Sequence, residues 1–195
     1  MPSTMFRRFL VCTALAAIAA HAGALTIYDS ARLVYEPAVR TLSLDGFGRV
    51  ITPTGGGGAA ASVMAMNGAP SQFLDRWLLG LAGVPAGPYV VSSFQIDATG
   101  ALTFDAVTFN SINASGGVDT LLFGLNAART TAVASGTFTV LPSCPIASCV
   151  WVDVIGQPAP GGVGDGYTGS MHAALVPEPA SLALMLAGLA ALGAW

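Results

Sequence analysis

The chain contains no lysine, and its seven basic residues are all arginines spread over 195 residues. A P-loop needs a lysine that contacts the nucleotide phosphates, so the absence of lysine excludes this class of nucleotide site. Charged residues make up only 9% of the chain, and its ten carboxylates outnumber the arginines. A protein of this charge has no basic surface of the kind that binds nucleic acid. We therefore expect no nucleic-acid partner.

Residues that commonly bind metals or act as nucleophiles are also scarce. The chain has two histidines, and His172 is the only one after residue 24. A zinc site would lack ligands, and no G-x-S-x-G sequence positions a serine nucleophile. Residues 164–169 match G-x-G-x-x-G, but a dinucleotide site needs a helix directly after this motif, and a proline-containing segment follows instead. We expect a body that is not an enzyme, with no catalytic residue, no metal and no cofactor.

The first 24 residues have the three parts of a secretory signal peptide. An arginine pair precedes an apolar stretch at residues 9–20, and the small residues Ala22 and Ala24 follow as cleavage sites. The apolar stretch is too short for a membrane-spanning helix, which needs about 17 residues or more. The sequence thus predicts a signal-peptide helix over residues 1–24, which the Sec translocon and signal peptidase would recognise.

The end of the chain is its other distinctive segment. Pro177 and Pro179 bracket a lone carboxylate, Glu178, and an uninterrupted apolar run follows at residues 182–195. Proline fixes φ and disfavours helix in the residue before it, so the P-E-P sequence should be extended and exposed. The apolar run is shorter than a typical membrane span of about 20 residues. Hydropathy alone therefore leaves two interpretations open, a core helix and a membrane segment.

A P-E-P sequence followed by an apolar helix at the C-terminus resembles the PEP-CTERM sorting signal of exported bacterial proteins. The resemblance rests on Pro177, Glu178, Pro179 and the apolar run, whereas the arginine-rich tail usual in that family is replaced by an end at Trp195. It implies a transmembrane helix within residues 176–195 and recognition of the P-E-P sequence by a membrane enzyme of the exosortase type, which cuts at or near it. It also implies transient anchoring in the inner membrane of a Gram-negative bacterium, then transfer to the cell surface or extracellular matrix.

Two cysteines, Cys144 and Cys149, lie close together in the sequence C-P-I-A-S-C. Export places them in an oxidising compartment, where a closely spaced pair favours a structural disulfide. A metal site and a redox pair are the alternatives, but metal partners are scarce and the C-x-x-C spacing of redox pairs is absent. The pair therefore predicts a disulfide that closes a small loop.

Residues 25–175 are enough for one domain with a substantial core. Short alternating stretches predict strands, for example at residues 41–45 and 89–97, and turn signals recur about every ten residues. The alternation changes parity near Asp105, which predicts a β-bulge or a break. This pattern favours an all-β body, an antiparallel β-sandwich or jelly-roll-like fold, over alternating strands and helices.

Residues 71–83 are ambiguous between helix and strand. Apolar residues recur there at helical spacing, yet Phe73, Asp75 and Trp77 alternate as in a strand. This F-x-D-x-W sequence and the glycine-rich end of the body are similar to a group of PEP-CTERM proteins with an F-x-D-x-F motif. In that group both segments are expected to be strands, so we interpret residues 71–83 as a strand.

Three classes of function remain open. The first is an exported surface or matrix protein whose non-catalytic body is associated with exopolysaccharide in a biofilm. The second is a carbohydrate-binding module, because exposed rings of Trp77, Tyr89 or Trp151 could stack on sugars, although core packing is the competing interpretation. The third is a secreted hydrolase, which would require two carboxylates that converge in a cleft.

Overall fold

The computed structural model describes residues 25–52, 60–62, 73–143, 149–158, 164–177 and residue 187, with only the backbone described for residues 25–28, 51, 52 and 60–62. The predicted signal peptide with Ala22 and Ala24, and also Cys144, Glu178 and Pro179, lie outside the described residues. Among the described residues, no helix is both long and apolar enough to cross a membrane.

The described chain consists almost entirely of strands, which confirms the predicted all-β class. In chain order the strands are β1 Leu25–Glu36, β2 Thr41–Asp45, β3 Gly48–Thr52, β4 Ala60–Ser62, β5 Phe73–Gly80, β6 Gly87–Thr99, β7 Thr103–Ile112, β8 Val118–Leu122, β9 Gly124–Leu125, β10 Thr131–Val140, β11 Val150–Gln157 and β12 Asp165–Leu175.

All of these strands belong to one hydrogen-bonded sheet. Its order is β8-β7-β11-β5-β1-β2-β12-β6-β10-β9, with β3 paired to β12 and β4 paired to β3. The expected antiparallel two-sheet sandwich is wrong in two respects, because the sheet is continuous and because the pairs β1–β5 and β3–β4 are parallel. The parallel β1–β5 pair is possible because a long crossover, residues 37–72, connects the two strands.

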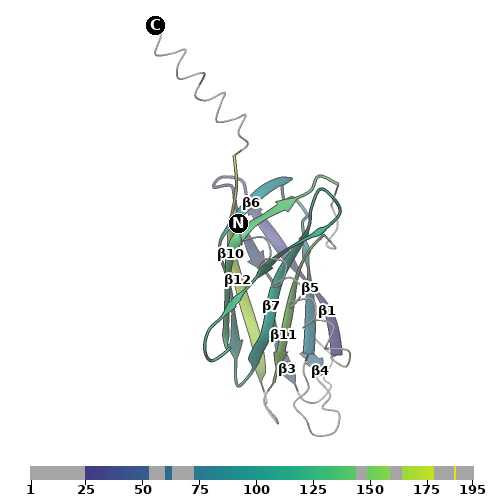
Figure 1. The fold of residues 1–195 in the computed structure, drawn as a ribbon, viewed down its shortest axis with the longest axis vertical. Coiled ribbons are helices and arrows are strands. Elements are labelled where there is room, and N and C mark those ends of the chain that lie inside the picture. The colour runs from purple at the N-terminus through teal and green to yellow at the C-terminus, as the bar shows by residue number, and fades with distance from the viewer. Residues whose placement is uncertain are drawn as a thin grey trace, which may run out of the picture.

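The two ends of this sheet approach each other, so it is nearly closed around a single core (Figure 1). β10 lies beside β7 and β8 across the remaining opening. The backbone N–H of Phe123, the one residue between β8 and β9, donates to the carbonyl of Val107 at 3.2 Å. The chain therefore passes from one end of the sheet to the other at Phe123.

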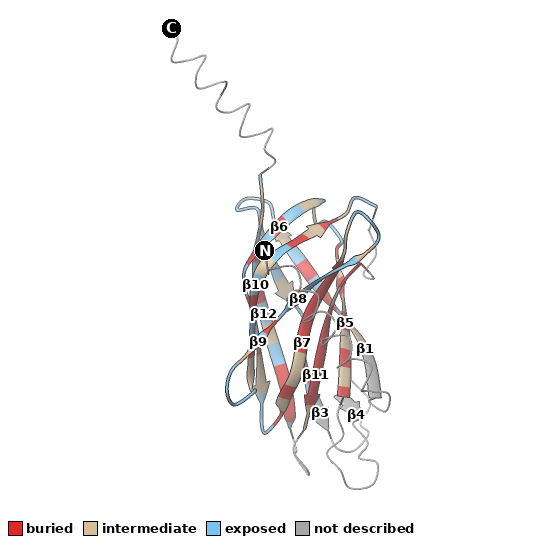
Figure 2. Ribbon diagram, in the orientation of Figure 1, coloured by how far each residue is buried: buried red, intermediate tan, exposed pale blue. Residues whose placement is uncertain are grey.

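Strand alternation builds the core. β5 has buried residues at every second position, and β7 and β11 are buried over most of their length (Figure 2). This confirms that residues 73–80 form a strand. The pairing of β7 with β11 shifts register between Phe104 and Ala106, so Asp105 is the extra residue of a β-bulge, as the sequence predicts.

The strand directions place the connections at two rims. We call the rim where the chain leaves β12 the C-terminal rim; it comprises residues 37–40, 81–86, 113–117, 141–143 and 176–177. The opposite rim includes the turn at residues 100–102 and the loop at residues 126–130.

Candidate functional site

The F-x-D-x-W sequence lies on β5 with all three side chains directed into the core. Phe73 and Asp75 have no exposed surface, and Trp77 is 2% exposed. This follows from the period of two along a strand, which places alternate residues on one face of the sheet. The motif therefore brings a carboxylate into an otherwise aromatic interior, where it needs compensating partners.

Arg49 on β3 supplies the main partner of Asp75. Its Nε and Nη2 atoms donate to the two carboxylate oxygens of Asp75, the Nη2–Oδ1 distance being 3.0 Å. Nη2 also donates to Asp29 Oδ2 on β1 at 3.0 Å. The Arg49–Asp75 pair is a bidentate ion pair, the strongest geometry available to these two side chains.

Tyr167 on β12 completes the arrangement. Its hydroxyl donates to Asp75 and accepts a hydrogen bond from Trp77 Nε1 at 2.7 Å. The guanidinium carbon of Arg49 lies 5.3 Å from the centroid of the Trp77 ring, within the range of a cation–π interaction. We call Asp29, Arg49, Asp75, Trp77 and Tyr167 the buried polar cluster; it joins β1, β3, β5 and β12.

Burial and the ion pair act in opposite directions within this cluster. Burial raises the pKa of Asp75, while hydrogen bonds from Arg49 and Tyr167 oppose the rise. Burial also lowers the pKa of Arg49, but its hydrogen bond to Asp75 and the charge of that carboxylate outweigh this, so the pKa is raised. Burial, then the charge of Asp75, raises the pKa of Tyr167 well above its ordinary value. Tyr167 is therefore a neutral donor at physiological pH.

The glycines of β12 allow the strand to approach its neighbours closely. A Cβ atom on Gly166 would lie 2.2 Å from the carbonyl oxygen of Arg49, and one on Gly169 would lie 2.7 Å from the ring of Phe47. Phe47 uses this space to pack on Trp77, with ring centroids 4.9 Å apart. The glycine-rich sequence of residues 164–169 thus has a packing role around the cluster.

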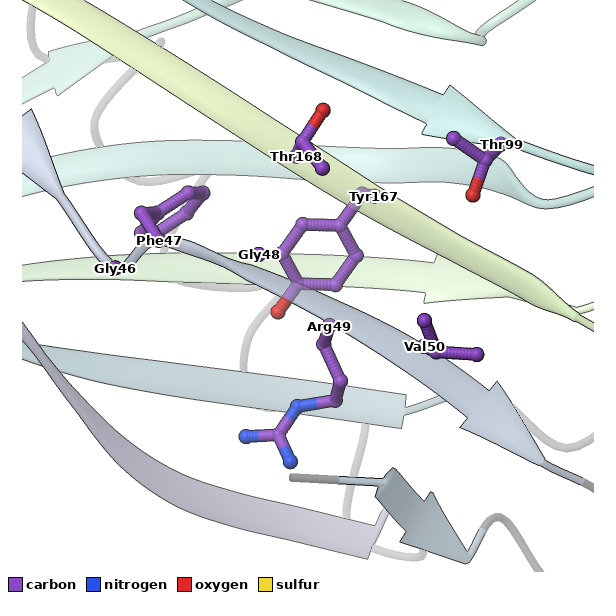
Figure 3. Close-up of a pocket in the computed structure, with 8 residues that line it drawn as sticks. All are labelled: Gly46, Phe47, Gly48, Arg49, Val50, Thr99, Tyr167 and Thr168. Atoms are coloured by element: carbon purple, nitrogen blue, oxygen red, sulfur yellow. The ribbon is translucent and has the colours of Figure 1, made fainter. Parts of the chain in front are cut away.

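A pocket of about 710 Å³ borders the cluster. Its lining residues are Gly46, Phe47, Gly48, Arg49, Val50, Thr99, Tyr167 and Thr168, and Figure 3 shows the two rings and the Arg49 side chain in its wall. Every buried polar side-chain atom of the described residues has a hydrogen-bond partner. Arg49 and Tyr167, the buried polar residues that border this pocket, are both engaged with Asp75.

This engagement limits the chemistry that the pocket can perform. Asp29 and Asp75 both bind Arg49, and Asp75 has no exposed surface, so neither is a free acid or base of the kind that glycoside hydrolysis requires. In the part of the chain that the structure describes, no three metal-ligating side chains come together. The buried polar cluster thus links four strands through hydrogen bonds and ion pairs.

A second polar group lies on the outer face of the sheet. Val150, Val152 and Val154 of β11 belong to the core, so Trp151 and Asp153 point to the other face. Arg76 of β5, opposite Asp153, donates to it through Nε at 2.6 Å and Nη2 at 2.9 Å.

The Trp151 indole closes this outer group. Arg76 lies over the Trp151 ring at 5.5 Å, and Trp151 Nε1 donates to Asp153 at 3.2 Å. Asn110 on β7, directly opposite Trp151, accepts a hydrogen bond from Thr120 on β8 at 2.8 Å. We call Arg76, Asn110, Thr120, Trp151 and Asp153 the tryptophan patch. Trp151 is half-buried within it, whereas Trp77 and Tyr89 are core residues.

The other predicted site residues fall near the two ends of the folded body. Cys149 is buried and disulfide-bonded, while its predicted partner Cys144 lies outside the described residues, so that pairing stays a prediction. Pro177 is exposed and lies two residues after the end of β12. No family model matches the chain, and no curated protein matches it either.

Sequence patterns do not identify Arg49 and Tyr167 as partners of Asp75, since they lie 26 and 92 residues away along the chain. One signal was available in the sequence. A carboxylate at an inward position between two aromatic residues needs a buried cationic partner, and only five arginines follow residue 24. That reasoning limits the possible cationic partners of Asp75 to five arginines, but it does not show which of them is the partner.

Proposed function

We propose that this chain is an exported protein of the bacterial cell surface or extracellular matrix, with a non-catalytic β-rich body between two processing signals. The observation that carries the proposal is the position of the P-E-P sequence relative to the fold. β12 ends at Leu175, and the exposed Pro177 follows it within two residues. A processing enzyme would thus meet the sequence directly outside the folded body.

In this proposal residues 1–24 form the signal-peptide helix for Sec-dependent export, and residues 182–195 form a short transmembrane helix. The chain would be held in the inner membrane until an exosortase-type enzyme cuts at or near Pro177, Glu178 and Pro179. The disulfide at Cys149 supports export, because disulfides persist in oxidising compartments. The body would then remain at the surface in association with exopolysaccharide.

The two carboxylates of the buried polar cluster, Asp29 and Asp75, support a non-catalytic body. Both bind Arg49, and the inner one is fully buried, so the hydrolase alternative has no available acid–base pair at this location. The buried polar cluster instead serves the stability of the body outside the cell.

Cell fractionation of a processing variant tests the proposal. Replacing Pro177, Glu178 and Pro179 together by alanine should leave the fold unchanged while the precursor accumulates in the inner membrane. Ser181→Ala, just beyond the sequence, is the matched control and should be released normally. Equal release of the triple variant and the control would contradict the proposed processing signal.

Glycan binding is a second candidate, favoured by the tryptophan patch. Trp151 is an outward-facing ring surrounded by the polar groups of Arg76, Asn110 and Asp153, and aromatic rings with adjacent hydrogen-bonding groups are suited to sugar rings. Sedimentation with insoluble exopolysaccharide from the host should detect this binding. Trp151→Ala should abolish glycan binding, while Trp151→Phe should retain part of it. If both variants bind as much glycan as the unchanged chain, the tryptophan patch is not the binding site.

A further inference from the structure

We propose that the C-terminal rim of the body rests on the lipid headgroups of the bilayer while the chain is anchored. This inference rests on the proposed C-terminal membrane anchor and adds an interaction surface to it. The partner is a neutral lipid surface, to which the rim presents apolar loops. This contact would determine which end of the body faces the membrane during processing.

The composition of the rim supports a lipid partner. The turn at residues 37–40 reads Pro-Ala-Val-Arg, and Val39, at 64% exposure, is the most exposed of the large hydrophobic residues of the described chain. The loop at residues 81–86 and residues 141–143 consist of apolar residues, glycine, proline and one serine. Among the described residues that make up this rim, Arg40 is the only one with an ionisable side chain, and the exposed Glu36 precedes it by one turn. The rim can therefore approach headgroups with little desolvation of charge.

A groove at the same rim, lined by residues without polar side chains, is an independent observation. It has a volume of about 260 Å³ and is lined by Leu81, Ala82, Gly83, Val84, Ala86, Val140, Leu141 and Pro142. The Tyr89 hydroxyl donates to the carbonyl of Pro85 at 2.9 Å, and the N–H of Val84 donates to the carbonyl of Leu81 at 3.0 Å. These bonds hold the loop at residues 81–86, which forms one wall of the groove.

The path of the chain brings this rim close to the membrane. The N–H of Leu175 donates to the carbonyl of Arg40 at 3.0 Å, and that of Val176 donates to Pro88 at 2.9 Å. These bonds fix the point where the chain leaves the body between the turn at residues 37–40 and the loop at residues 81–86. Five residues lie between Val176 and Leu182, and even a fully extended chain covers these six Cα–Cα steps in no more than about 22 Å. The point where the chain leaves the rim therefore stays within about 22 Å of the start of the apolar run.

The opposite rim is unsuited to the same role. It carries the Arg129–Asp105 ion pair at 3.0 Å and the buried Asp165, which accepts from the N–H of Ala101. β6, which runs between the rims, has 13 residues and thus a length of about 40 Å. An end with these charges, separated from the C-terminal rim by up to about 40 Å, should stay in water.

A fluorescence experiment on the anchored chain tests this orientation. The chain is purified from membranes of the exporting cells, its N-terminus is established by intact mass, and it is inserted into phosphatidylcholine vesicles. An NBD label is attached to Val39→Cys at the C-terminal rim or to Ala101→Cys at the opposite rim, both exposed positions. Lipids with a nitroxide near the headgroup then quench a label that lies at the bilayer surface. Ala82→Cys, on the second apolar loop, provides an independent rim position.

We expect a blue shift and loss of most of the emission at residues 39 and 82, with no change at residue 101. A chain that floats with the vesicles but shows no quenching at residues 39 and 82 would overturn the rim proposal and leave the anchor intact. Quenching at all three positions would also overturn it, because the body would then lie on its side. A chain that does not float with the vesicles would overturn the proposed anchor, and the rim proposal with it.

Discussion

Replacing Asp75 with asparagine should destabilise the body more than any comparable change of surface charge. Arg49 has 4% of its side chain exposed, so it cannot turn to water when its partner loses its charge. The substitution would leave Arg49 with Asp29 as its one charged partner, whose side chain is 31% exposed and which accepts only one hydrogen bond from Arg49. The Tyr167 hydroxyl would also lose a charged acceptor.

The expected size follows from the cost of an unpaired buried charge. Removing one partner of a buried ion pair typically destabilises a protein by about 3–5 kcal/mol. For a domain of this size, 1 kcal/mol corresponds to about 2–4 °C in Tm, so the shift should be about 6–20 °C. The double variant Arg49→Leu with Asp75→Leu should lose less than Asp75→Asn, because it leaves no unpaired charge in the core.

Urea unfolding of residues 25–177, monitored by near-UV circular dichroism, measures the unfolding free energies, and thermal unfolding of the same samples measures the Tm values. Asp45→Asn changes the same charge at an exposed position and should shift the unfolding free energy by no more than about 0.5 kcal/mol. A loss below about 1 kcal/mol for Asp75→Asn would refute the reasoning, since the buried polar cluster would then contribute little. A double variant less stable than Asp75→Asn would refute the argument about the unpaired guanidinium.

Three further predictions concern other parts of the body. Burial raises the pKa of Tyr89 to about 12, so the unfolded chain releases its proton first and this group lowers stability by at most about 2 kcal/mol as the pH rises from about 10 to about 12. Tyr89→Phe should reduce the fall in stability over this range without abolishing it, because the raised pKa of Tyr167 acts in the same direction. Gly166→Ala should destabilise the fold by at least about 1–3 kcal/mol because its Cβ would meet the Arg49 carbonyl, whereas Gly80→Ala, whose nearest contact is 3.5 Å, should be nearly neutral. The body should contain no free thiol, and reduction of the disulfide at Cys149 should lower stability by about 2 kcal/mol, the value for a small loop; a thiol titration that finds two reactive groups before reduction would contradict this.

Local patterns predicted the strands well because each strand has one face in the core. The alternation at residues 41–45 coincides with β2, and the parity change at Asp105 is a β-bulge. Residues 73–80 were ambiguous because their leucines also fit a helical stripe. Their strand conformation is decided by pairing with β1 and β11 on both sides, which contributes backbone hydrogen bonds that no local pattern shows.

Pairing between distant strands could not be predicted in the same way. The parallel β1–β5 pair depends on a crossover of residues 37–72, and the approach of β10 to β7 and β8 depends on the curvature of the whole sheet. Both features arise because all strands pack around one core. They therefore produce no sequence pattern at a fixed residue spacing from which they could be predicted.

The buried polar cluster shows the same limit for a site. The alternation of the sequence predicts that Asp75 points inward. Its pairing with Arg49 depends in addition on the packing of Phe47 against Trp77 and on the space that Gly169 leaves for Phe47. The tryptophan patch likewise requires Arg76, Asn110 and Trp151 to be brought side by side by the register of three strands.

The two ends of the released protein test the central proposal most directly. Intact mass spectrometry of the protein recovered from the cell surface and medium of the exporting host gives both ends in one measurement. We predict a form that begins near residue 25 and ends at or near residues 177–179, and that disappears from a strain lacking the exosortase-type enzyme. A released protein that still carries Trp195, or one released equally without that enzyme, would contradict the proposal.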